Sequence, residues 1–156
     1  MNDERYRPPQ ADLTVPDSDA GSGVKAVMVG VLADIGGTLL VGLLFGISYG
    51  FYLARQGLVA EQILQAIEHI EPFSVLGMLS SLLGLLVSML AGYLCARIAN
   101  HSEYKYAAIL GVVSCLFGVL IGADFYSLIE VVAVMLVTFA AVLFGTWLHV
   151  RRKDYG

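Results

Sequence analysis

Charged residues are scarce in this chain. Only 14% of its 156 residues are Asp, Glu, Lys or Arg, and 58% are hydrophobic, whereas soluble globular proteins carry about 25% charged and about 45–50% apolar residues. The net charge is −4 and most of the charges lie in the predicted tails and loops, a balance that argues against a nucleic-acid partner. The composition predicts an integral membrane protein that has the lipid bilayer as its main partner.

Residues in patterns typical of catalytic or metal-binding sites are also few. The two cysteines, Cys95 and Cys115, lie inside apolar runs without C-x-x-C spacing or neighbouring histidines, as is typical of reduced packing residues. No nucleophile elbow, phosphate-binding glycine loop or metal motif occurs. Glu68, His69 and Glu71 are near neighbours in one predicted helix, where such neighbours point in different directions. We therefore expect no enzymatic activity, no cofactor and no metal site.

Proline is nearly confined to the first 23 residues, which hold three of the four. This segment is acidic and has little apolar surface to bury, so residues 1–23 are predicted to form a disordered tail. It lacks the basic start and short apolar core of a secretory signal.

Long apolar runs make up most of the remaining chain. A membrane-spanning helix needs about 20 apolar residues, and four runs supply roughly that length or more. They predict transmembrane helices at residues 26–54, 73–96, 106–123 and 127–150. Tyr, Phe and Trp residues border these runs, as expected at the two lipid–water interfaces. The predicted fold class is an all-α four-helix membrane bundle.

The basic residues predict the orientation of this bundle. Eight of the nine Lys and Arg residues lie in the amino-terminal segment, the loop between spans two and three, or the basic end at 151–156, and only Arg55 lies in the first outer loop. Positively charged loops favour the cytoplasm. Both termini are therefore expected there, and a bacterial inner membrane is the natural location for so compact a chain.

The 18-residue outer loop "RQGLVAEQILQAIEHIEP" is the only long one. Its apolar residues fall at helical spacing, with glutamates and glutamines on the other face. An amphipathic helix is predicted at about residues 58–71, ended by Pro72.

Small residues recur at every fourth position in the first two spans. Rows of this kind let helix backbones approach closely in lipid. The third span offers a shorter row with Ser114, Gly118 and Gly122. The first two spans are predicted to pack antiparallel along their rows, the alternative being that one row serves a homodimer. The principal packing residues are Gly42, Gly46, Gly50, Ser80, Gly84 and Gly92.

Asp34 interrupts the first of these rows, and intramembrane acids are candidates for function. Counting about 20 residues back from the aromatic belt near Tyr49 places Asp34 about one helical turn inside the cytoplasmic boundary. In a structural interpretation this shallow acid bonds to Ser88 or Tyr93, or pairs with Arg97. In a functional interpretation it binds a proton or another cation in a small transporter.

Two other acids border the last two spans. Asp124 lies in the predicted tight turn "GADFYS", where Asp is common. Glu130 lies one turn inside the belt at Tyr126, within reach of the headgroup region.

Two resemblances accompany these patterns. The tail stretch "RYRPPQADL" resembles the Tyr-x-Pro-Pro-x-Ala segment that precedes the spans in uncharacterised bacterial inner-membrane proteins, with Arg5 where a proline often stands. The four-span layout with an acid in the first span is similar to the small multidrug resistance transporters. Those proteins lack a long tail and a long outer loop, and they use a glutamate deep in the first span. Neither resemblance assigns a site residue to this chain.

The favoured hypothesis is a non-enzymatic membrane protein that acts through interactions, as a subunit, scaffold or regulator. Its partner would be a second copy or another membrane protein. The alternative is a small ion-coupled transporter with Asp34 as the coupling carboxylate, and only this alternative requires an ion or small-molecule substrate. A pore-forming protein is disfavoured because no span carries a continuous polar stripe.

Overall fold

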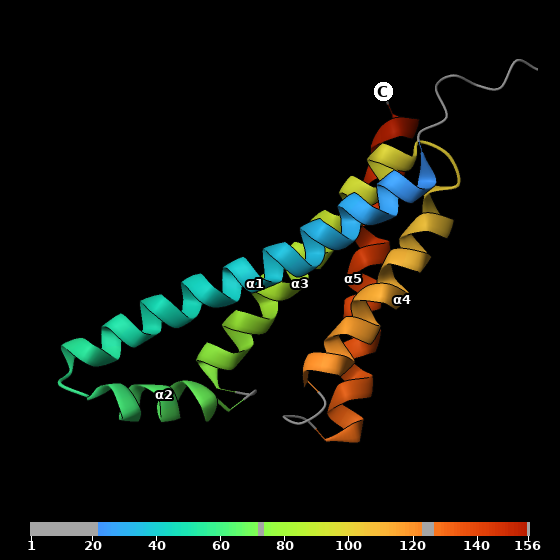
Figure 1. Cartoon of the computed structure of the whole chain (residues 1–156). Coiled ribbons are helices and arrows are strands. Elements are labelled where there is room, and N and C mark those ends of the chain that lie inside the picture. Colours follow the sequence, from blue (N-terminus) through green and yellow to red (C-terminus); the bar gives the residue numbers. More distant parts are fainter. Residues whose placement is uncertain (1–21, 72–73, 123–126, 156) are drawn as a thin grey trace, which may run out of the picture.

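A computed structural model describes residues 22–71, 74–122 and 127–155 of the chain (Figure 1). Four of its helices are long and apolar enough to cross a membrane, which confirms the predicted four-helix membrane bundle. A short fifth helix lies between the first two spans, where the amphipathic helix was predicted. The helices are α1 (Gly23–Arg55), α2 (Ala60–Glu68), α3 (Val75–Ala99), α4 (Glu103–Gly122) and α5 (Leu128–Asp154).

Serine residues begin three of the long helices. Ser22 and Ser74 each accept a hydrogen bond from a backbone N–H in the first turn, which satisfies a donor that has no partner within the helix. At the start of α5, Ser127 and Glu130 form a reciprocal capping box, with the Ser127 N–H and hydroxyl each donating to Glu130 Oε2 at 2.8 Å. Glu130 is thus a cap of α5. Asp124 lies outside the described residues.

Each of the four long helices extends beyond its predicted span at one end or both. The predicted boundaries follow the apolar runs, which end at the membrane surface, whereas helices continue into water. At the end of α5, basic side chains extend the helix because they interact favourably with its carboxyl-terminal dipole. Residues 1–21, most of the predicted tail, lie outside the described residues.

The described ends of the chain lie together at one end of the bundle, called here the terminal end (Figure 1). Helix α3 is central and packs against α1, α4 and α5, while α1 has no contact with α5. From the terminal end, α1 and α5 run apart toward the opposite end (Figure 1). The buried core is formed by Ala26, Ala91, Cys95, Ala99, Ala107, Leu110 and Val142.

The amphipathic helix α2 folds back against the far end of α1. A Cβ atom on Gly50 would lie 3.5 Å from Ile63 and 3.8 Å from Ile67. The predicted apolar face of α2 therefore packs on a glycine of α1, and its glutamates remain exposed.

The closest helix approach is between α3 and α5. A Cβ atom on Gly92 would overlap the carbonyl of Val142, and one on Gly145 would overlap the carbonyl of Met89. Thr146 is fully buried at this crossing and donates to Gly92 O at 3.2 Å and to Val142 O at 3.1 Å. Gly92 therefore packs against α5, whereas the small-residue row predicted that it packs against α1.

The other glycines of the predicted row lie in open space. Among the described residues, a Cβ atom on Gly42, Gly46 or Gly84 would meet nothing within 4 Å, so these glycines do not lie in the contact between α1 and α3. Ser80 is half-buried. Helices α1 and α3 do pack together, but nearer the terminal end, where Gly37 lies against Val87. The difference arises because a helix that is apolar on every side does not show which face meets which neighbour.

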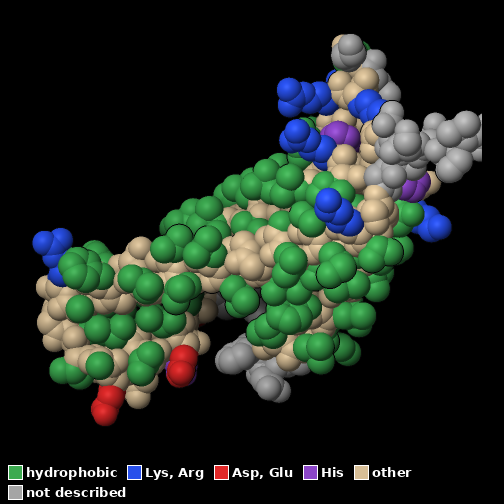
Figure 2. Space-filling model, turned by 45° about the horizontal axis from the view of Figure 1, so that its top comes forward, with side chains coloured by type: hydrophobic (Ala, Val, Ile, Leu, Met, Phe, Trp, Pro, Cys, Tyr) green, Lys and Arg blue, Asp and Glu red, His purple; other side chains and the backbone are tan. Residues whose placement is uncertain are grey.

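Charges gather at the two ends of the molecule. Lys and Arg side chains surround the terminal end, while acidic side chains lie near α2 at the other end (Figure 2). At the terminal end, Lys153 donates to Asn100 Oδ1 at 3.1 Å and forms an ion pair with Glu103 at 3.4 Å. Asn100 ends α3 in the left-handed conformation, with φ of 52°. These contacts fasten the end of α5 to the tight turn between α3 and α4.

Candidate functional site

The most distinctive polar group inside the bundle is the Asp34 carboxyl. Its side chain projects from α1 toward α3, and the residue is only 4% exposed. The Ser88 hydroxyl, 5% exposed, donates a hydrogen bond of 2.7 Å to Asp34 Oδ1. Ser88 was one of the three partners considered from the sequence, and the structure brings these two residues together.

Asp34 bonds to α3 at a point well away from either end of that helix. Ser88 lies thirteen residues after the start of α3 and eleven before its end, about 20 and 16 Å along the helix axis. The bonded carboxyl is therefore level with the middle of α3. Helix α1 has 33 residues and is inclined to α5 (Figure 1), and the depth of Asp34 below the membrane surface stays a prediction.

A third buried polar residue, Ser114, lies on α4 near the same level. It is 7% exposed, and its hydroxyl oxygen is buried without a hydrogen-bond partner. One turn earlier on the same face, Leu110 covers Gly30 of α1, where a Cβ atom would lie 2.8 Å from Leu110 Cδ2. Helices α1 and α4 both begin at the terminal end (Figure 1). Asp34 and Ser114 therefore each lie one turn beyond this contact.

The other two predicted partners of Asp34 lie elsewhere. Tyr93 packs its ring edge against His149 of α5, with ring centroids 5.2 Å apart, and Arg97 is exposed at the terminal end. At 3.6 residues per turn, these residues lie about 140° and 180° around α3 from Ser88. A helix that presents Ser88 to α1 must turn them away.

Sequence reasoning missed the polar role of Ser114 and the packing role of Gly145. Ser114 belongs to a recognised small-residue row, but whether its hydroxyl is buried depends on how α4 is rotated. Gly145 follows Ala141 by four residues. This short small-xxx-small pair is the sequence signal for the face of α5 that packs against α3. The sequence "SLIE" at 127–130 is likewise a capping-box signature.

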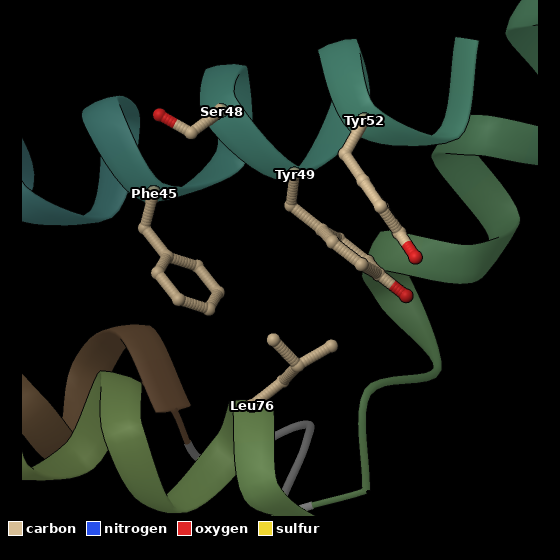
Figure 3. Close-up of a pocket in the computed structure, with 5 residues that line it drawn as sticks. All are labelled: Phe45, Ser48, Tyr49, Tyr52 and Leu76. Atoms are coloured by element: carbon tan, nitrogen blue, oxygen red, sulfur yellow. The ribbon is translucent and has the colours of Figure 1, made fainter. Parts of the chain in front are cut away.

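A second candidate site is an open pocket of about 480 Å³ at the far end of α1 and α3. Phe45, Tyr49 and Tyr52 point from α1 toward Leu76 of α3 (Figure 3). The Ser48 hydroxyl at its edge is already bonded to Leu44 O at 2.7 Å. The lining is mainly apolar and aromatic, so it suits a hydrocarbon group such as a lipid chain.

The two sites differ in what they can do chemically. The aromatic pocket offers contact area but no charged group in its lining. The buried site offers one carboxylate, a hydroxyl group bonded to it and a second hydroxyl group on α4. No protein-family model, curated protein or solved structure matches this chain, so its function is inferred from this geometry.

Proposed function

We propose that this chain is a non-enzymatic membrane protein that acts by binding another transmembrane helix along the far half of α1. Gly42 and Gly46 support this proposal because they lie on one face of α1, where a Cβ atom would meet no other described residue within 4 Å. Glycines spaced by four residues permit close backbone approach between helices in lipid. The helix that fits this face directly is α1 of a second copy.

The experiment measures self-association of the full chain in lipid vesicles by energy transfer between labelled copies. Gly42→Leu and Gly46→Leu fill the proposed contact face and are expected to lower the energy transfer. Both glycines lie in open space, so folding of the single chain is expected to survive.

Gly36→Leu provides a matched control. Gly36 also has nothing within 4 Å, but it lies about 120° around the helix from Gly42. This variant is expected to associate normally. Equal association of all four proteins would contradict the proposal.

The proposed orientation places both termini in the cytoplasm of a bacterial cell. The clustering of Lys and Arg at the terminal end supports it (Figure 2), because basic segments are retained on the cytoplasmic side. A phosphatase that works only outside the cytoplasm should be inactive at the carboxyl end and active in the loop before α2. The opposite result would reverse the orientation.

A second candidate function is ion-coupled transport through Asp34. The observation that favours it is the burial of this carboxyl group, which is 4% exposed and bonded to Ser88 of α3, since acids at membrane depth commonly mark ion pathways. Vesicles containing the wild type should dissipate an imposed pH gradient faster than vesicles containing Asp34→Asn. Equal rates would remove Asp34 from any coupling role.

A further inference from the structure

We propose that Asp34, Ser88 and Ser114 form a proton-binding site between α1, α3 and α4. The proposal deepens the transport candidate by naming its ion, and it rests on that candidate only for the use that the cell makes of the bound proton. Proton binding is measured by spectroscopy and transport by the decay of a pH gradient. A failure of the binding proposal can therefore be told apart from a failure of the transport proposal.

The two buried hydroxyl groups can accommodate a bound proton. With Asp34 ionised, Ser88 supplies a donor to Oδ1, and the buried Ser114 hydroxyl has no partner. A protonated carboxyl gains one O–H donor, and Ser114 offers an acceptor near the level of the second carboxyl oxygen. The Asp34 and Ser114 side chains make no hydrogen bond in this structure, so in the protonated state we expect the Ser114 side chain to rotate and accept from Asp34 while Ser88 still donates to it.

The charge balance also favours a bound proton. An ionised carboxylate is costly to bury without a cation, and protonation removes that charge. On the helices packed against α1, the nearest charged residues in the described part of the chain are Arg97 on α3 and Lys105 on α4. Each lies nine residues from the serine of its helix, about 14 Å along the axis.

The titratable groups nearer the site are neutral thiols. Cys115 follows Ser114 on α4, lies within reach of the Asp34 charge, and donates to Met135 O of α5 at 3.4 Å. Cys95 of α3 packs against Gly30, one turn from Asp34. Tyr93 is turned toward His149 of α5, a helix that does not contact α1. Neither thiol supplies a positive charge to Asp34.

A metal ion fits the site less well than a proton. Within residues 22–71, 74–122 and 127–155, no three His, Cys, Asp or Glu side chains gather in a metal-binding group. Hard cations prefer six or more oxygen ligands, often with several carboxylates. The proton needs only the carboxylate and one acceptor, and the reaction is complete when Asp34 takes up a proton from water and becomes neutral.

The experiment is infrared difference spectroscopy of the full chain in lipid nanodiscs, recorded while the pH is raised. The wild type should show the stretching band of a protonated carboxyl group at acid pH and lose it at alkaline pH. Asp34→Asn should lack this band, while the bands of the other acids persist. Loss of the same band on adding sodium at constant pH would show a cation site instead and overturn the proposal.

Two milder variants test the serines without removing the acid. Ser114→Ala removes the proposed acceptor and should shift the Asp34 band to higher frequency, and Ser88→Ala should shift it by removing a donor. Ser102→Ala, in the exposed turn before α4, is the control and should leave the band unchanged. An unshifted band in Ser114→Ala, or no Asp34-dependent band at any pH, would overturn the proposal.

Discussion

Gly92 of α3 lies directly against the backbone carbonyl of Val142 of α5, with no room for a Cβ atom between them. The reciprocal contact of Gly145 with Met89 makes this crossing a meeting of two backbones. Backbone atoms cannot move aside as the end of a flexible side chain can. The α3–α5 crossing is therefore the least adaptable contact in the bundle.

Substitution at this crossing should destabilise the protein. Gly92→Ala and Gly145→Ala are each expected to lower the free energy of unfolding by about 1–3 kcal/mol or more, because overpacking forces the helices apart. Unfolding in mixed detergent micelles gives the measurement. Gly84→Ala, on the same helix but in open space, should be neutral or slightly stabilising. Equal effects at Gly92 and Gly84 would show that the close crossing is absent.

Thr146 should contribute less than the glycines. Thr146→Val keeps the side-chain shape but removes the hydrogen bond to Gly92 O, and hydrogen bonds between membrane helices contribute about 0.6 kcal/mol on average. We expect a loss of stability of that size, measured by the same unfolding assay. Thr38→Val, on an exposed face of α1, is the matched control and should cause no loss.

The Asp34–Ser88 bond predicts energetic coupling between the two residues. A double-mutant cycle with Asp34→Ala and Ser88→Ala should give an interaction energy of about 1 kcal/mol or more, because each substitution removes one partner of the bond. If the two effects simply add within about 0.5 kcal/mol, the hydrogen bond does not stabilise the bundle.

The capping box predicts a local effect at the start of α5. Ser127→Ala removes the cap acceptor and should cost about 0.5–2 kcal/mol of stability. Hydrogen exchange should rise mainly in the first turn of α5, because that turn loses the cap. A uniform rise along α5 would contradict a local capping role.

The sequence predicts the number of spans much better than the contacts between them. Apolar length identifies α1, α3, α4 and α5, and helical spacing in the outer loop identifies α2. Helix rotation is harder, because apolar side chains surround each span and do not distinguish lipid from protein. For this reason Gly42 and Gly92 look equivalent in sequence, although only Gly92 meets another helix in the chain.

The candidate site was predicted only in part. Asp34 stands out because it is an acid in an apolar run, and Ser88 lies at a plausible distance along the next span. The choice among Ser88, Tyr93 and Arg97 depends on the angular position of each residue around α3. Ser114 is assigned to the site because Leu110, one turn before it, contacts Gly30, one turn before Asp34. This contact joins two helices that are far apart in sequence, and residue spacing within one helix does not reveal it.

The length of α1 has a mechanical consequence. Its 33 residues extend for about 50 Å, whereas the hydrocarbon layer is about 30 Å thick. This hydrophobic mismatch is relieved by tilting α1 or by projecting its ends into water. Since the far half of α1 does not contact α5, its tilt is free to follow bilayer thickness while the terminal end stays packed. In a thinner membrane, α1 should tilt further from the bilayer normal and carry α2 with it. The thickness of the bilayer would then set the angle between α1 and the rest of the bundle.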